Sequence, residues 1–302
     1  MAVRIGVGLG RFSFESIRSF RSWLDLCEES AIDSIWQSDQ VVTSHPSPEP
    51  LSLVAMVAGA TLRLKVGMNA VVLGFRDPVI FARQCAAIDF LSDGRLLPVV
   101  GVGLAASPSW QATGRSPRGR GARANEALEI ITRLWSGERV SFQGEHYQLR
   151  DAEISPLPVQ KPLPIWIGGS SQAAIRRTVR YGTGWLAGLQ TASEAVETAA
   201  AIRREGTAQG RAIPEDHYGA TILYRIEPGG APTAPEPELP GSASPLLVSG
   251  DAQGLIAKIR EYTDGGITKF VAIPLVRSEA EWFEQTRLLD REVIPEAFAI
   301  PV

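Results

Sequence analysis

The chain has 302 residues, of which 44% are hydrophobic and 21% are charged, so it has enough apolar material for a large core. Its net charge of -3 argues against nucleic acid as the main partner, because phosphate backbones favour proteins with a clear cationic excess. Its two cysteines give neither a disulfide framework nor the spacing of a zinc site, and we expect no metal site.

The N-terminal segment and the hydropathy of the chain bear on its location. The first residues, MAVRIGVGLGRF, lack the pattern of a signal peptide, and no apolar run is long enough to span a bilayer. Cys27 and Cys85 each sit in an apolar helical pattern, and we expect them to be buried thiols of a reducing compartment. We therefore expect a cytoplasmic protein with no membrane partner.

Short β-branched runs alternate with longer amphipathic stretches along the chain. The first half predicts strand Val3–Leu9, helix Phe14–Ser30, strand Ser34–Gln37, helix Leu51–Ala60, strand Leu64–Val72, helix Val79–Phe90, strand Arg95–Gly101 and helix Asn125–Trp135. A hairpin that turns at Gln143-Gly144 follows. The second half predicts strand Pro164–Ile167, helix Gln172–Tyr181, strand Trp185–Gly188, helix Ser193–Gln209, strand Tyr218–Arg225, helix Ala252–Thr263, strand Lys269–Ile273 and helix Glu279–Ala297.

Eight strands that alternate with helices predict an α/β fold with a parallel sheet, because parallel strands need crossover connections. Eight repeats over this length favour a single (β/α)8 TIM barrel, with residues 1–302 forming one domain. An open doubly wound sheet would place a glycine fingerprint after its first strand, and Gly6, Gly8 and Gly10 do not give that spacing.

Three insertions interrupt the repeat after strands two, four and seven. They are Val42–Pro50, the arginine-containing segment Ala105–Ala124, and Glu227–Pro245, which is rich in proline and glycine and is expected to be a flexible flap. All three follow strands, so they lie on the face where barrels place their active sites.

Polar and small residues end several predicted strands. Ser38, Asp39 and Gln40 follow strand two, where Asp39 can either face the central pocket or cap the following turn; the sequence leaves both open. Asn69 and Ala70 lie at the end of strand three. Gly101 and Gly103 end strand four without a bulky side chain, so a planar ring or a backbone can approach closely.

The run PLPIWIGGSSQAAIRR leads from the fifth strand into a helix. Gly168 and Gly169 make the turn, and Ser170 or Ser171 caps the helix. The free N–H groups and the dipole at such a helix end suit a phosphate group, although an ordinary capped turn explains the same residues.

The chain resembles the luciferase-like monooxygenase family, especially its deazaflavin-dependent members. The matching segments are SIWQSD, RDPVIFARQCAAIDFLSDGRLLPVVGVG, NEALEIITRLWSGERVSFQGEHYQL, SPLPVQKPLPIWIGG, RYGTGWLAG and SGDAQGLIAKIREYTDGGITKFVAIPL. The resemblance implies a reduced flavin or deazaflavin at the barrel mouth, Asp39 and Gln40 as catalytic residues, and a non-prolyl cis peptide at Ala70-Val71. The implied cofactor-binding residues are Ser38, Asp39, Asn69, Ala70, Val71, Gly101, Gly103, Leu104, Gly168, Gly169 and Ser170.

The chain departs from the family at several of these positions. Deazaflavin-dependent relatives usually have histidine after the aspartate, but this chain has Gln40, which cannot act as a general base near neutral pH. Thr183-Gly184-Trp185 replaces the usual D-G-W. His45 could replace the missing base, although a solvated loop histidine is the more ordinary interpretation.

Three functions fit this pattern. The first is an oxidoreductase that uses reduced deazaflavin (coenzyme F-420, written F420) for hydride transfer to or from a small organic substrate. The second is a two-component monooxygenase that uses reduced FMN and dioxygen, with a flavin or deazaflavin reductase as partner. The third is a cofactor-binding protein without turnover. The resemblance also suggests a homodimer, and the sequence does not identify the substrate.

Overall fold

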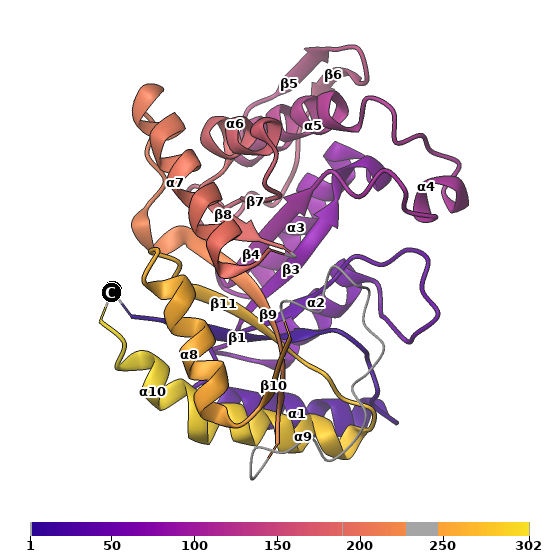
Figure 1. Ribbon diagram of the computed structural model, residues 1–302. Coiled ribbons are helices and arrows are strands. Elements are labelled where there is room, and N and C mark those ends of the chain that lie inside the picture. Colours follow the sequence, from indigo (N-terminus) through magenta and orange to yellow (C-terminus); the bar gives the residue numbers. More distant parts are fainter. Residues whose placement is uncertain (1, 189, 228–246, 302) are drawn as a thin grey trace.

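The computed structural model describes residues 2–188, 190–227 and 247–301, and it confirms the predicted barrel (Figure 1). Its eight strands are β1 (Arg4–Leu9), β2 (Ser34–Gln37), β3 (Lys65–Val72), β4 (Leu96–Gly101), β7 (Trp166–Gly168), β8 (Gly184–Ala187), β9 (Tyr218–Ile226) and β11 (Lys269–Pro274). Each pairs in parallel with the next, and the pairing of β8 with β9 closes the ring.

Helices connect the strands, and all except the short α4, which lies in the connection after β4, form the outer layer. They are α1 (Ile17–Glu29), α2 (Pro50–Ala60), α3 (Pro78–Leu91), α4 (Ser109–Ala112), α5 (Arg120–Trp135), α6 (Gln172–Tyr181), α7 (Ala192–Ala208), α8 (Ala252–Thr263), α9 (Glu279–Leu288) and α10 (Ile294–Phe298). In the part of the chain that the structure describes, no helix is both long and apolar enough to cross a bilayer.

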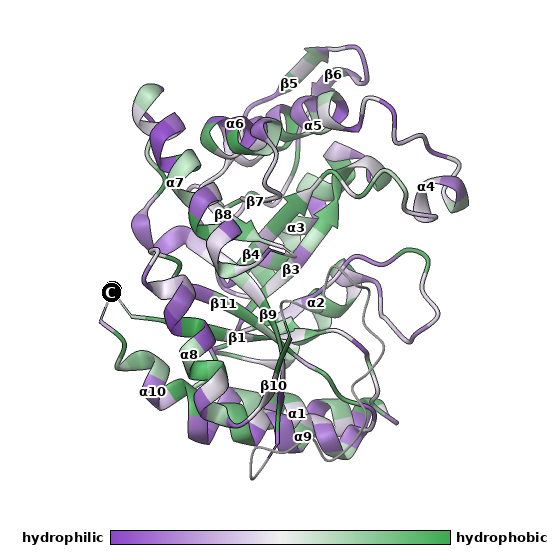
Figure 2. Ribbon diagram, in the orientation of Figure 1, coloured by the Kyte–Doolittle hydropathy of each residue, from purple (hydrophilic) through white to green (hydrophobic). Residues whose placement is uncertain are grey.

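The strands form because their residues can be buried on both faces. All nine residues of β9, YGATILYRI, are buried, as expected for a barrel strand covered by helices outside and side chains inside. The helices instead bury one stripe: α6 buries Ala174, Ile175, Arg177, Thr178 and Val179 and exposes Arg176 and Arg180. Figure 2 shows this contrast as green strands beneath helices of mixed colour.

Two tryptophans fill the middle of the barrel. Trp36 and Trp166 pack with Val99, Leu186 and Val271 in an interior cluster. A Cβ atom on Gly67 would lie 2.4 Å from the Trp36 ring, and one on Gly184 would lie 2.4 Å from Cε2 of Trp166. Since each ring occupies the space above a glycine, the interior is packed through its middle and open sites are confined to its two ends.

Several elements differ from the sequence-based expectation. The hairpin is confirmed as β5 (Val140–Gln143) and β6 (Gln148–Ala152), joined by four residues. The predicted helix Glu279–Ala297 is broken by a π-helical turn at Leu289–Val293, and α5 begins at Arg120, inside the predicted insertion Ala105–Ala124.

Strand β10 (Leu247–Gly250) was missed. It pairs with the second half of β9, beyond the point where β8 ends, so its formation depends on an edge that β8 leaves free. Except for Glu227, the predicted flap Glu227–Pro245 lies outside the described residues.

Asp89, an acidic residue of the matching segment RDPVIFARQCAAIDFLSDGRLLPVVGVG, has a structural role. It is completely buried on α3, and its carboxylate accepts hydrogen bonds from the backbone N–H groups of Val159 and Gln160 (2.8 and 3.0 Å) and from the Gln160 side chain. These bonds hold the connection that enters β7.

We predict that Asp89→Ala lowers the free energy of unfolding by about 3 kcal/mol, because it leaves two buried backbone donors without acceptors. Urea denaturation measures this change. Asp25→Ala, at an exposed position of α1, is the control and is expected to change stability by less than about 0.5 kcal/mol. Similar stability losses in the two variants would contradict the anchoring role.

Candidate active site at the barrel mouth

The predicted site residues gather at the carboxyl ends of four consecutive strands, β2, β3, β4 and β7. These ends point to the right-hand side of Figure 1, where α4 and the 38–49 connection also lie. Sequence positions about 130 residues apart are therefore neighbours on one rim, as the barrel prediction required.

Three residues on this rim lack side chains beyond Cβ and lie close together. A Cβ atom built on Gly101 would lie 3.8 Å from Cβ of Ala70, and one built on Gly168 would lie at the same distance from it. All three residues are half-buried. We call Ala70, Gly101 and Gly168 the small-residue floor, because they leave a bare surface on which a flat ring could rest.

A hydrogen bond crosses the barrel beside this floor. The Asn69 side-chain amide donates to Oγ1 of Thr221 at 2.9 Å. In the strand order, β3 and β9 lie opposite each other in the ring of eight, so this bond spans the barrel interior. Thr221 was not among the predicted site residues, although its even spacing from Gly219 and Leu223 on a doubly buried strand is compatible with an inward position.

Asp39 is engaged on both carboxylate oxygens. One accepts the backbone N–H of Val72 and the other accepts from the Arg76 guanidinium, each at 3.0 Å, and only 2% of the side chain is exposed. Arg76 also pairs with Glu49 at 3.1 Å. The sequence left open whether Asp39 caps a turn or faces the pocket. In the structure, its hydrogen bonds link the end of β2 to the end of β3.

Glu49 completes this network at the start of α2. Burial disfavours the charge of Glu49, but the hydrogen bonds from Ser52 and the nearby charge of Arg76 outweigh it and lower the pKa of the carboxyl. The carboxylate is the N-cap of α2, so the ion pairs join the helix to the strand ends. Ser38 is half-buried before Asp39, whereas Gln40 and His45 are exposed.

The corner after β7 has the geometry expected for it. Gly169 adopts a φ of +106°, which side chains disfavour, and its carbonyl accepts a hydrogen bond from Nε1 of Trp185 at 2.9 Å. Ser171, not Ser170, is the N-cap: its hydroxyl accepts from the N–H of Ala174 at 3.2 Å. Ser170 is exposed beside the first turn of α6.

The implied cis peptide bond is present but displaced by one residue. It joins Asn69 and Ala70, not Ala70 and Val71. The register of β3 against β4 shifts between Met68 and Val71, so the irregular segment of the strand includes this bond, and Val71 is already paired with Val100 in the regular ladder.

The segment after β4 is held by Trp110. Its Nε1 donates to the carbonyl of Leu104 at 2.8 Å, its ring packs against Phe75 with centroids 4.4 Å apart, and only 3% of it is exposed. Trp110 therefore anchors its loop. Leu104, predicted to bind the cofactor, is 77% exposed on that loop.

The arginines of this segment mainly hold the backbone. Arg115 donates to the carbonyl of Gly74 at 2.7 Å and Arg120 to that of Gly103 at 3.2 Å, while Arg123 donates to the carbonyl of Ser116. Gly103 itself has a φ of +71° beside Val72. Among the described residues, no cluster of histidine, cysteine and carboxylate side chains could hold a metal ion.

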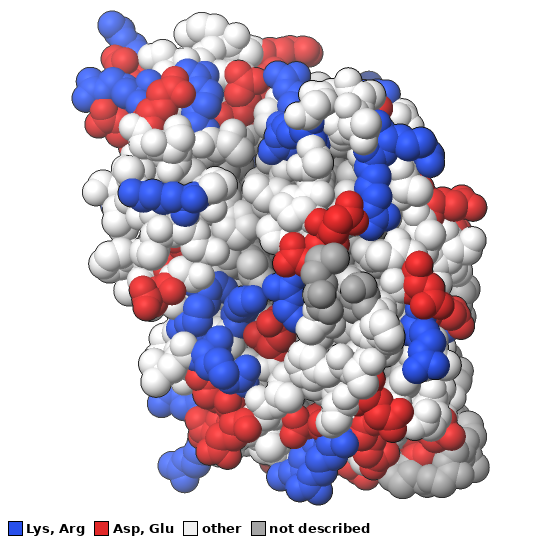
Figure 3. Space-filling model, turned by 90° about the vertical axis from the view of Figure 1, so that its left-hand side faces the viewer, with Lys and Arg blue, Asp and Glu red and all other residues white. Residues whose placement is uncertain are grey.

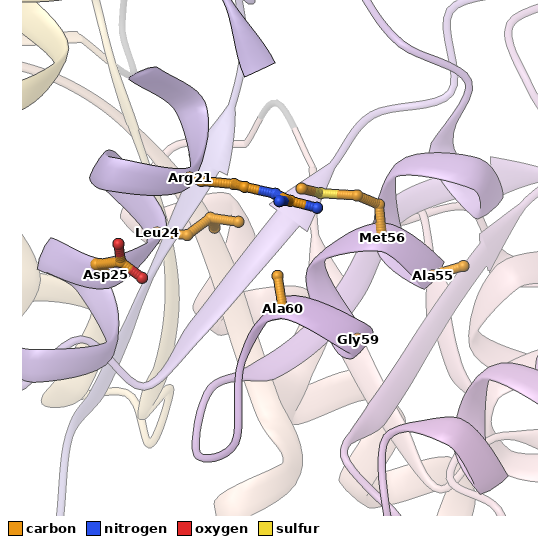
Figure 4. Close-up of a pocket in the computed structure, with 7 residues that line it drawn as sticks. All are labelled: Arg21, Leu24, Asp25, Ala55, Met56, Gly59 and Ala60. Carbon is orange, nitrogen blue, oxygen red and sulfur yellow. The ribbon is translucent and has the colours of Figure 1, made fainter. Parts of the chain in front are cut away.

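Two further cavities lie away from the barrel mouth. One lies where the strands begin, on the face seen in Figure 3. Another, of about 560 Å³, lies between α1 and α2, where Arg21 extends from α1 toward Met56 of α2 (Figure 4). Apart from Arg21 and Asp25 its lining is apolar or small, and it faces away from all strand ends, so it lacks convergent polar groups.

Comparisons with known proteins agree with this geometry. A family model described as luciferase-like monooxygenase matches residues 2–228. The F420-dependent glucose-6-phosphate dehydrogenase of Kineococcus radiotolerans is 33% identical over 166 residues, which cover 53% of this chain and 49% of that protein. The match therefore spans about half the length of this curated relative.

Solved structures share the fold over almost the whole chain. The monooxygenase RslO1 from Streptomyces bottropensis superposes with a TM-score of 0.82 at 17% identity, covering 97% of this chain and 99% of that one. An F420-dependent secondary alcohol dehydrogenase in complex with an F420-acetone adduct superposes with a TM-score of 0.79 at 18% identity, covering 99% of each chain. At these identities the similarity shows the fold alone.

The Asp39–Arg76 ion pair leads to a test by double-mutant cycle. We predict that Asp39→Ala lowers the free energy of unfolding by about 3 kcal/mol, because it leaves the Val72 N–H without its acceptor and the Arg76 guanidinium with Glu49 as its one remaining carboxylate partner. The double variant with Arg76→Ala should lose at least about 1 kcal/mol less than the two single losses added together. Guanidinium chloride denaturation of the four proteins gives these values.

Arg76 also pairs with Glu49, and Glu49→Gln is the matched control for that ion pair. This variant removes the pair with Glu49 and leaves Asp39 in place. Strictly additive losses in the cycle would show that Asp39 and Arg76 do not stabilise the rim together.

Proposed function

Because this chain belongs to the luciferase-like monooxygenase family, we propose that it is an oxidoreductase that uses coenzyme F420 to move a hydride to or from a small organic substrate. The F420-dependent relative and the F420-dependent structural neighbour support this cofactor. The substrate of the curated relative is not carried over, because the match covers about half of that protein.

One observation of the structure carries the proposal. The small-residue floor of Ala70, Gly101 and Gly168 lies at the carboxyl ends of three adjacent strands, where barrels bind their ligands. Any larger side chain at these positions would occupy the space that a planar ring needs. The residues present therefore fit a flavin or deazaflavin ring.

The remaining parts of the rim suit the rest of such a cofactor. The first turn of α6, after Gly169 and Ser170, presents N–H groups and the positive end of the helix dipole to a phosphate group. When bound, F420 would supply the hydride chemistry, and the protein would contribute position and electrostatics. Asp39 is a positioning residue: its hydrogen bond to the Val72 N–H fixes the end of β3 next to the small-residue floor.

Gln40 limits the kinds of reaction that fit. An amide neither donates nor accepts a proton near neutral pH, but it can hold a substrate by hydrogen bonds. Gln40 is exposed directly after the buried Asp39, so its side chain is free to turn toward a bound substrate. Hydride transfer to an activated alkene or imine needs no strong base, and this substrate class fits the chain best.

A second candidate function is an FMN- and dioxygen-dependent monooxygenase, because solved monooxygenases, one of them in complex with FMN, share this fold. It would need a reductase as a partner to supply reduced FMN. We also propose, from the family, that the chain forms a homodimer; exposed apolar side chains on α3, among them Ile80, Phe90 and Leu91, suit such a contact.

A binding titration separates these functions. Tight, stoichiometric binding of F420 with no affinity for FMN is the expected result, followed by F420-linked turnover in a screen of activated alkenes and imines. Binding of FMN alone would instead establish the second function. Stoichiometric F420 binding without turnover in a broad screen would support a cofactor-binding protein that lacks catalysis.

We predict that Gly101→Val and Gly168→Val each weaken F420 binding by about tenfold or more, because the added methyl groups project over the small-residue floor. Fluorescence titration measures the affinity, and circular dichroism checks that the variants fold. Gly59→Val is the control, because a Cβ atom on Gly59 of α2 has no atom within 4 Å. Unchanged affinity in both floor variants would place the ring elsewhere.

We further predict that Gln40→His raises turnover by about 100-fold if a missing base limits the rate. The gain should grow as pH rises through about 6.5, because only the neutral imidazole can accept a proton. A pH profile of kcat measures this. Gln40→Asn keeps the amide and is the control. A histidine variant with an unchanged rate at every pH would show that proton transfer is not limiting.

A further inference from the structure

A second cavity lies at the opposite end of the barrel, where the strands begin. It has a volume of about 470 Å³, which is enough for a small metabolite. Figure 3 looks onto this end and shows Lys and Arg side chains, with some Asp and Glu side chains among them, beside a white, uncharged area near the middle of the face. No part of the floor, the Asp39 network or the α6 corner contributes to it.

Four cationic residues line this cavity. Arg4, Lys65 and Lys269 are the first residues of β1, β3 and β11, and Arg211 precedes β9. No Asp or Glu is among its described lining residues. The starts of the neighbouring strands β11 and β1, and of β3 beyond β2, thus bring three basic residues to one cavity.

Carboxylates near this space balance only part of the charge. Asp33 contacts both Lys65, at 3.6 Å, and Lys269, and Asp216 pairs with Arg4 at 3.0 Å. Arg211 donates to the backbone carbonyl of Val179. Two carboxylates thus face the four basic side chains that line the cavity.

The cations also destabilise one another. Lys269 has only 3% of its side chain exposed, and its ammonium group donates to Oγ of Ser34 at 3.0 Å. Burial and the charge of Arg4 lower the pKa of Lys269, although Lys269 also contacts Asp33. Burial and Arg4 lower the pKa of Lys65 as well. An added anion would relieve this repulsion.

An aromatic wall stands beside the cations. The Trp166 ring lies against His217 with centroids 5.6 Å apart, and both residues line the cavity. Trp166 is 5% exposed, and its Nε1 has no hydrogen-bond partner among the described residues. An unpaired buried donor is costly, so an acceptor atom of a ligand that reached this indole N–H would be stabilised by it.

We propose that this cavity binds the phosphate dianion of a small phosphomonoester. Arg4, Lys65 and Arg211 hold the phosphate at the cavity, the buried Lys269 lies behind them, and the organic part packs against Trp166 and His217. The site lies at the far end of the barrel from the small-residue floor, so it does not depend on the function proposed for that end.

Isothermal titration calorimetry of the full chain with phenyl phosphate and with inorganic phosphate tests the proposal. We expect one phenyl phosphate per chain, with affinity reduced at least about tenfold by Lys65→Gln and by Arg211→Gln, two variants that leave Lys269 in place. Lys258→Gln is the control, because Lys258 lies on α8 and pairs with the exposed Glu261. Circular dichroism confirms that each variant folds.

The two ligands distinguish the source of the phosphate. Tighter binding of phenyl phosphate supports a phosphomonoester that uses the aromatic wall, whereas equal affinity would show that free phosphate is the ligand and overturn the role of the wall. Absence of binding by either ligand, or losses no larger in Lys65→Gln and Arg211→Gln than in Lys258→Gln, would overturn the site.

Discussion

The closure of the ring between β8 and β9 is the constraint on which both ends of this barrel depend. Trp185, Leu186 and Ala187 pair with Tyr218, Gly219 and Ala220, and this ladder places β9 opposite β3. Only then can Asn69 reach Thr221 across the interior, and only then do the ends of β3, β4 and β7 form one side of a closed mouth. An open sheet would separate these residues.

The two ends of the barrel differ in chemistry because a packed layer separates them. Trp36 and Trp166 fill the middle, each above a glycine, so neither end opens into the other. The mouth has a floor of small residues, and Asp39, Arg76 and Glu49 beside it are paired with one another. At the other end, three strands begin with a basic residue, and their charges are only partly balanced. A flat cofactor suits the first surface and a small anion the second.

Much of the fold could be predicted from the sequence, because most barrel strands are short, largely apolar segments bounded by turn residues, as in β9. Strand β10 could not, since it depends on an edge left free by a strand far away in the sequence. The residues of the mouth were found by motif, but the roles of Asp39 and Trp110 depend on contacts with Val72, Arg76 and Phe75 that no local pattern specifies. The basic cavity was missed because each strand contributes one residue to it.

The most direct test of the account is a crystal structure of the chain soaked with F420. We expect electron density for the ring over Ala70, Gly101 and Gly168, with the cofactor phosphate at the first turn of α6 beside Gly169 and Ser170. Density for the ring at any other surface, or a phosphate bound away from that turn, would contradict it.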